Sequence, residues 1–162
     1  MPNIDDLITK IEHEEGDGKV TNDAHDSGGK TQYGISEASN PEAWADGQVS
    51  EKEARNIYLR KYVLGPKFDL ITFYPLMAQL VDFGVTSGPQ LAIMKLQEIL
   101  GVAQDGILGE KTLRALALLD GKWVNNQLVG CRVRMIGRIV KKNPTQLDYL
   151  GGWLDRSVSF LV

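Results

Sequence analysis

The sequence is organised around one short stretch near its start, Glu14-Glu15-Gly16-Asp17-Gly18-Lys19. Apolar residues with the spacing of one helix face run directly into it: Ile4, Leu7, Ile8 and Ile11. Glu15 continues this stripe, so we expect its carboxyl on the buried face in the last turn of a helix. Gly16 is expected to end that helix.

A carboxyl on an apolar stripe suits acid catalysis. Removing a carboxylate from water costs free energy, so burial raises a carboxyl pKa towards neutrality. Such a group can give a proton to a reacting oxygen at neutral pH. Glu15 is therefore the predicted general acid, and its neighbour Glu14 is the alternative.

The segment 21–36 is polar and rich in Gly, Asn and Asp, which predicts a loop with tight turns. A short β-hairpin closed at residues 27–29 fits this composition. The loop carries Asp26 and Thr31. A carboxylate with a hydroxyl can hold an attacking water or stabilise positive charge on a sugar, while an acid protonates the leaving oxygen. Glu15, Asp26 and Thr31 thus form a predicted catalytic set for hydrolysis of a glycosidic bond.

These residues resemble the "EGGY" muramidases of glycoside hydrolase family 108, many of which are phage endolysins. The residues that carry the resemblance are Glu15-Gly16, Asn22-Asp23, Asp26, Gly28-Gly29, Thr31 and Tyr33-Gly34-Ile35-Ser36. The chain departs from the family pattern at Gly16-Asp17-Gly18-Lys19, where the family has Gly-Gly-Tyr, and its Glu-to-Asp spacing is longer. The resemblance implies a hydrolase that cleaves the β-1,4 bond between N-acetylmuramic acid and N-acetylglucosamine in bacterial peptidoglycan.

Three further residues are predicted to contact the substrate. Tyr33 offers an aromatic face that suits a sugar ring. His25 lies beside Asp26 in the same loop. Gly29 allows a positive φ or a close approach of the backbone to the substrate. The sequence contains no P-loop, G-x-G-x-x-G or H-E-x-x-H motif, and we expect neither a cofactor nor a metal.

Two other functions compete with hydrolysis. A lysozyme-like body could act without catalysis, as a peptidoglycan-binding or phage structural protein; the altered stretch after Glu15 favours this reading. A lytic transglycosylase would use the muramyl 6-hydroxyl in place of water. The pairing of Asp26 with Thr31 disfavours a transglycosylase, because only hydrolysis needs a held water.

A second informative stretch lies in the C-terminal half. Its apolar spacing and turn dipeptide predict a helix, a turn and a helix over Leu96-Gln97, Leu100-Gly101, Asp105-Gly106, Gly109 and Thr112-Leu113. These residues are similar to the signature of helical peptidoglycan-binding modules. The predicted fold is mainly α: a lysozyme-like helical domain with a small loop or β-hairpin beside the cleft and a helical, peptidoglycan-binding-like C-terminal half. We expect one domain over 1–162, with a catalytic lobe over 1–85 and a helical lobe over 86–162.

Length and composition are ordinary for a soluble globular protein. The chain has 162 residues, 43% of them hydrophobic, and a formal net charge of −3, which argues against nucleic-acid binding. Its single cysteine, Cys131, excludes an internal disulfide. The first residues lack the features of a signal peptide, and no apolar run reaches membrane-spanning length. We therefore expect a protein made in a bacterial cytoplasm that reaches the cell wall or periplasm through a holin or a secretion system. We also expect it to be a monomer.

Overall fold

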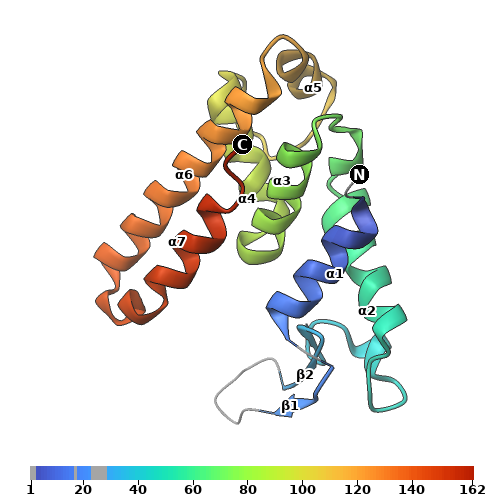
Figure 1. Ribbon diagram of the computed structural model, residues 1–162. Helices are drawn as coiled ribbons and strands as arrows, with labels where there is room; N and C mark the ends of the chain where they lie inside the picture. Colours follow the sequence, from blue (N-terminus) through green and yellow to red (C-terminus); the bar gives the residue numbers. More distant parts are fainter. Residues whose placement is uncertain (1–2, 17, 23–28) are drawn as a thin grey trace. The chain divides into compact units, whose positions relative to one another are not determined.

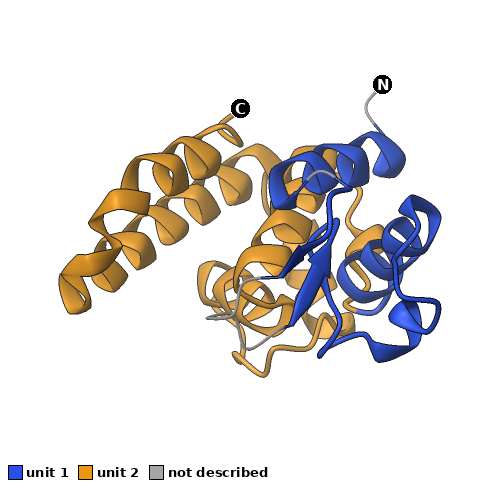
Figure 2. Cartoon of the chain, turned by 90° about the horizontal axis from the view of Figure 1, so that it is seen from below, with its two compact units in different colours: residues 1–65 blue, residues 66–162 orange. Residues whose placement is uncertain are grey.

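The computed structural model describes residues 3–16, 18–22 and 29–162, and it confirms a mainly helical chain with one small sheet (Figure 1). The chain forms two compact units, residues 1–65 and 66–162, which Figure 2 colours separately. These units divide earlier in the chain than the lobes expected from the sequence, and the single domain stays a prediction. Within the described ranges, no helix is both long and apolar enough to cross a lipid bilayer.

The first unit combines helices with a three-stranded sheet. Its elements are α1 (Ile4–Glu15), β1 (Thr21–Asn22), β2 (Lys30–Gln32), β3 (Ile35–Ser36), the 3₁₀ turn η1 (Pro41–Trp44), α2 (Glu51–Tyr58) and the π-helical segment η2 (Leu59–Leu64). The strands form an antiparallel sheet in the order β1-β2-β3. The second hairpin, closed by Tyr33-Gly34, was not expected from the sequence.

The second unit is helical throughout the residues assigned to regular elements. Its elements are η3 (Phe68–Leu70), α3 (Tyr74–Ser87), α4 (Pro89–Leu100), α5 (Glu110–Ala117), α6 (Gly121–Lys142), η4 (Pro144–Tyr149) and α7 (Leu150–Val158). Helices α6 and α7 lie side by side, as Figure 1 shows. Its large, fully buried hydrophobic side chains include Phe68, Leu76, Leu80, Phe83, Leu96 and Leu128.

Helix α1 has clear signals at both ends. Asn3 accepts from the Asp6 amide and Asp6 accepts from the Asn3 amide, a reciprocal capping box. The helix ends at Glu15, as predicted, and Gly16 follows with φ 144°. The buried face is rotated from the expected one: its residues are Leu7, Ile8, Ile11 and Glu12.

Glu15 is half-buried rather than buried, which corrects the predicted stripe. The reason is that Arg55 on α2 forms an ion pair with Glu12. The buried carboxylate of α1 is therefore that of Glu12, three residues before Glu15.

Helix α2 begins at a capping box, which the spacing of Ser50 and Glu53 in the sequence predicts. Ser50 and Glu53 satisfy each other's backbone amides, and hydrogen bonds from Ser50 lower the pKa of the Glu53 carboxyl. The helix continues into η2, where the Gly65 amide donates to the Arg60 carbonyl at 2.8 Å, five residues back. A Cβ on Gly65 would lie 2.8 Å from that oxygen, so the end of the segment requires glycine.

A buried ion-pair cluster joins α3, α6 and α7. Asp82 accepts from Arg132 at 2.6 Å and from Arg156 at 2.8 Å. Only 2% of the Asp82 side chain is exposed, and the Arg132 guanidinium lies over the Phe83 ring at 5.1 Å. Arg156 belongs to the terminal Gly-Trp-x-x-Arg segment of the sequence, and its described contact is with Asp82.

Candidate active site

Glu15 is positioned by the end of α1 and by the turn that joins β2 to β3. The Gly16 amide donates to the Glu12 carbonyl at 3.1 Å, which closes the last turn of the helix behind Glu15. A Cβ built on Gly34 would lie only 2.8 Å from the Glu15 Cβ. The turn of the small sheet therefore packs directly on the predicted catalytic glutamate.

The turn itself has an unusual backbone. Tyr33 and Gly34 have φ values of 51° and 73°, and Gln32 pairs with Ile35 across them. Two central residues with positive φ are typical of a type I′ hairpin, which favours Asn, Asp or Gly at the first position. Tyrosine at that position is therefore an exception that needs a local cause.

The Tyr33 ring packs on the loop that follows Glu15. A Cβ on Gly18 would lie 2.5 Å from the Cζ and Oη atoms of this ring. Tyr33 is half-buried. Its predicted role as a sugar-binding face stays a prediction, and the described contact is with the backbone of Gly18.

Thr31 lies at the centre of a row of hydroxyl groups. It is directly opposite Thr21 on β1 and Ser36 on β3, and directly opposed residues share one face of a sheet. The Thr21 hydroxyl also donates to the Thr31 carbonyl at 3.3 Å. Thr31 is half-buried, in the same strand that leads into the turn against Glu15.

Two predicted site residues, Asp26 and His25, lie outside the described residues. Gly29 has the predicted positive φ, 69°, and its contact with substrate stays a prediction. The described part of the chain thus brings together Glu15 and the Tyr33-Gly34 turn, with Thr31 in the adjoining strand. In residues 3–16, 18–22 and 29–162, no three His, Cys, Asp or Glu side chains gather as metal ligands would.

Gln32 is a positioning residue that was not expected from the sequence. It is buried, its Nε2 donates to the Gly18 carbonyl at 2.9 Å, and its Oε1 accepts from the Val49 amide at 2.8 Å. It thereby ties the loop after α1 to the segment before α2. The alternation along β2, which turns Gln32 away from the face of Thr31, is the only sequence signal that could have found it.

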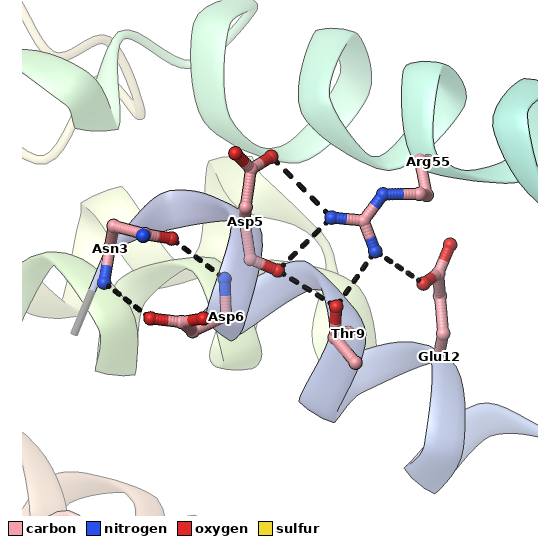
Figure 3. A network of polar contacts seen from close by, with 6 residues as sticks. All are labelled: Asn3, Asp5, Asp6, Thr9, Glu12 and Arg55. Carbon is pink, nitrogen blue, oxygen red and sulfur yellow. Dashed lines mark hydrogen bonds and ion pairs between the residues drawn. The ribbon is translucent and has the colours of Figure 1, made fainter.

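Arg55 organises a second polar network on α1 (Figure 3). Its Nη1 donates to the Thr9 hydroxyl at 2.8 Å and to Glu12 Oε2 at 3.0 Å, and its Nη2 donates to the Asp5 carbonyl at 3.2 Å. Burial raises the pKa of the Glu12 carboxyl, and the charge of Arg55 acts in the opposite direction. This network joins α1 to α2 one helical turn before Glu15.

The motif of the C-terminal half forms a cluster of its own. Gln97 is buried, and its Nε2 donates to Asp105 Oδ1 at 2.7 Å and to the Thr112 hydroxyl at 3.0 Å. Its Oε1 accepts from the Gly106 amide at 3.0 Å. Hydrogen bonds from Gln97 and from the Ile107 amide lower the pKa of the Asp105 carboxyl. The glutamine thus fixes the loop between α4 and α5.

A glutamate at the end of a helix, packed against a small sheet, is available as the general acid that hydrolysis of a glycosidic bond requires. Comparison with known proteins supports this class. Residues 8–88 match the family described as Glycosyl hydrolase 108, and residues 91–158 match the one described as Predicted Peptidoglycan domain. The chain belongs to the glycosyl hydrolase 108 family.

A solved structure has a similar fold over nearly the whole chain. It is the structure of Brucella abortus SagA, whose sequence is 27% identical to this chain and whose fold superposes with a TM-score of 0.73. The similarity covers 95% of this chain and 88% of that one. No curated protein sequence matches the chain.

Proposed function

We propose that the chain is a muramidase that hydrolyses the β-1,4 bond between N-acetylmuramic acid and N-acetylglucosamine in peptidoglycan. The two family matches support a hydrolase related to peptidoglycan. The observation that carries the proposal is the packing of the Tyr33-Gly34 turn on Glu15, which holds this glutamate next to a sheet that carries a row of hydroxyl groups.

Glu15 gives its proton to the oxygen of the leaving sugar as the bond to the anomeric carbon breaks. A water attacks that carbon, and its proton passes to a carboxylate acting as base. Asp26 is the proposed base or electrostatic partner. Thr31 is proposed to hold the water or to orient Asp26, and Tyr33, His25 and Gly29 to contact the sugars.

The proposed substrate also indicates where the protein acts. The wall is the substrate, so the protein acts in the cell wall or periplasm and lyses bacteria, as a phage endolysin does. We propose that it is made in the cytoplasm and crosses the membrane through a holin or a secretion system.

The test uses purified cell walls and the full chain. We expect the turbidity of the wall suspension to fall, and mass spectrometry to find fragments with reducing N-acetylmuramic acid ends. Glu15→Gln should lower the rate by about 10²–10⁴-fold, because the amide keeps the shape and lacks the proton. Glu14→Gln, the matched control, should retain activity.

Other outcomes would overturn the proposal in distinct ways. Loss of activity in Glu14→Gln alone would move the acid back by one residue. Anhydro-sugar ends would indicate a lytic transglycosylase. Binding to walls without fragments would indicate a non-catalytic wall-binding protein.

A further inference from the structure

We propose that Tyr58 is a positioning residue for Glu15, because its hydroxyl holds the Tyr33-Gly34 turn against the end of α1. The proposal rests on the proposed function of Glu15 as general acid. Tyr58 does not touch the substrate in this scheme, and it acts only through the turn.

The contacts run without a gap from Tyr58 to Glu15. The Tyr58 hydroxyl donates to the Tyr33 carbonyl at 2.9 Å, and Tyr58 is only 3% exposed. A Cβ on Gly34 would lie 2.5 Å from the Tyr58 Oη and 2.8 Å from the Glu15 Cβ. The Cβ position of Gly34 therefore faces both side chains at close range, so a shift of Tyr58 or Glu15 on this side affects the turn.

The turn needs such support because its backbone is strained. Tyr33 has a φ of 51°, a region that side-chain-bearing residues enter at a cost in free energy. Strained backbone of this kind persists where the surrounding structure fixes it, and it gathers at functional sites. The hydrogen bond from Tyr58 ends on the carbonyl of this strained residue, so it opposes relaxation of the turn.

Relaxation of the turn would disturb Glu15 and the loop that follows it. Gly34 contacts the Glu15 side chain itself, and the Tyr33 ring packs on Gly18 three residues later. One turn thus fixes the last residue of α1 and the loop that leaves it. An acid must lie within hydrogen-bonding reach of its target oxygen, and displacement by about 1 Å can reduce a rate 10²-fold.

Tyr58 is well placed to act as a fixed support. It is the last residue of α2, and η2, a π-helical segment, follows it directly. One turn earlier on the same helix, Arg55 bonds to Glu12, which lies three residues before Glu15. The two helices are therefore joined at corresponding positions, by an ion pair at Glu12 and through Gly34 at Glu15.

The experiment removes one hydroxyl from the full chain, with Tyr58→Phe. The matched control is Tyr62→Phe, because the Tyr62 ring lies 5.8 Å from that of Tyr58 and the same atom is removed. Rates on soluble glycan fragments are compared at a temperature where circular dichroism shows each variant to be folded. We expect kcat to fall at least about 10-fold in Tyr58→Phe with KM little changed, and both to stay at wild-type values in Tyr62→Phe.

Amide NMR spectra give a second, rate-independent result. The signals of Gly16 and Gly34 should shift in Tyr58→Phe and stay in place in Tyr62→Phe. Unchanged signals, an unchanged kcat in folded Tyr58→Phe, or an equal loss in Tyr62→Phe would overturn the positioning role. An active Glu15→Gln would instead overturn the proposed function, so the two failures are distinguishable.

Discussion

The Arg55 guanidinium lies 3.0 Å from the Glu12 carboxylate, and this pair joins α2 to α1 across 43 positions of the sequence. The Glu12 side chain is 8% exposed and that of Arg55 is 26% exposed. The pair is thus largely removed from water. Removing one partner of a buried ion pair strongly destabilises the fold, because the other charge is left buried alone. Replacing both partners by uncharged residues changes the stability much less.

Glu12→Gln should change how stability depends on pH. The pKa of Glu12 is raised by burial, so the folded chain binds this proton more tightly than the unfolded chain does. The stability that the protonated Glu12 carboxyl contributes is complete below pH 4.5, the pKa of the unfolded chain. It is lost as the pH rises through the higher pKa of the folded chain. Glu12→Gln has no carboxyl at this position, so its stability does not fall in this way as the pH rises. Its free energy of unfolding relative to wild type should therefore rise between pH 4 and pH 7, as measured by urea denaturation. The exposed neighbour Glu14→Gln controls for removal of a helix carboxylate, and a relative fall for Glu12→Gln would contradict the assignment.

Arg55→Met should be far more costly than Glu12→Gln at neutral pH. The methionine leaves the Glu12 carboxylate buried without the arginine that pairs with it. The Thr9 hydroxyl also loses the hydrogen bond that it accepts from Arg55. We expect the free energy of unfolding to fall by about 3 kcal/mol, the lower end for a broken buried pair. Arg60→Met removes an exposed arginine a little further along the chain and should stay within about 0.5 kcal/mol of wild type. Equal losses in the two variants would show that the pair contributes nothing specific.

Asp82→Asn tests the corresponding cluster of the second unit. The carboxylate accepts from Arg132 and Arg156, and its replacement leaves two guanidinium groups without their buried anion. The expected loss is about 3–5 kcal/mol in the free energy of unfolding. Asp155→Asn, an exposed change beside Arg156 on α7, is the control and should have little effect. A similar denaturation midpoint for the two variants would contradict the structural role given to Asp82.

Gln97→Leu should loosen the loop between α4 and α5. The leucine removes the hydrogen bonds of Gln97 to Asp105, Thr112 and the Gly106 amide, and leaves buried polar groups without partners, at a cost of about 1–3 kcal/mol. Gln104→Leu, exposed in the same loop, is the matched control.

The difference between wild type and Gln97→Leu should also depend on pH. The lowered pKa of Asp105 contributes stability above 3.8, its unfolded pKa, and this contribution is lost as the pH falls through the folded pKa. The difference in free energy of unfolding between wild type and Gln97→Leu, measured by denaturation, should therefore become smaller at acid pH. A gap that widens there would contradict the bond between Gln97 and Asp105.

Local chemistry made several elements predictable. Ser50 and Glu53 begin α2 because their side chains can satisfy the first amides of a helix, and Gly16 ends α1 where the sequence places it. The same local rules explain the ends of α4, which starts at Pro89 and ends before Gly101, a glycine in the left-handed conformation. The mainly helical fold and the family were also predictable, because the motif residues lie close together in the sequence.

What the sequence did not predict depends on distant partners. The burial of Glu12 requires Arg55, and the conformation of Tyr33 is supported by Tyr58, which no local pattern reveals. A helix in this part of the sequence could end at Gly84 by residue type alone, yet α3 continues to Ser87 and stops before Gly88, whose φ is 90°. Glycine permits a helix end without requiring one, so packing decides between candidate positions.

The last prediction separates backbone strain from packing at Glu15. Gly34→Ala adds a Cβ to a residue with φ 73°, at 2.5 Å from the Tyr58 Oη and 2.8 Å from the Glu15 Cβ. Gly47→Ala is the matched control, because Gly47 has a φ of 88° and nothing lies within 4 Å of an added Cβ. Gly47→Ala should therefore cost about 1–2 kcal/mol of stability for the backbone alone and leave kcat unchanged.

Gly34→Ala carries the same backbone cost and two close contacts in addition. Its free energy of unfolding should fall further than that of Gly47→Ala, because overpacking a filled site typically costs about 1–3 kcal/mol more. Its kcat should also fall at temperatures where the variant is folded, since the new methyl group must displace Glu15, Tyr58 or the turn between them. Equal stabilities and equal rates for the two variants would mean that the turn does not control the position of Glu15.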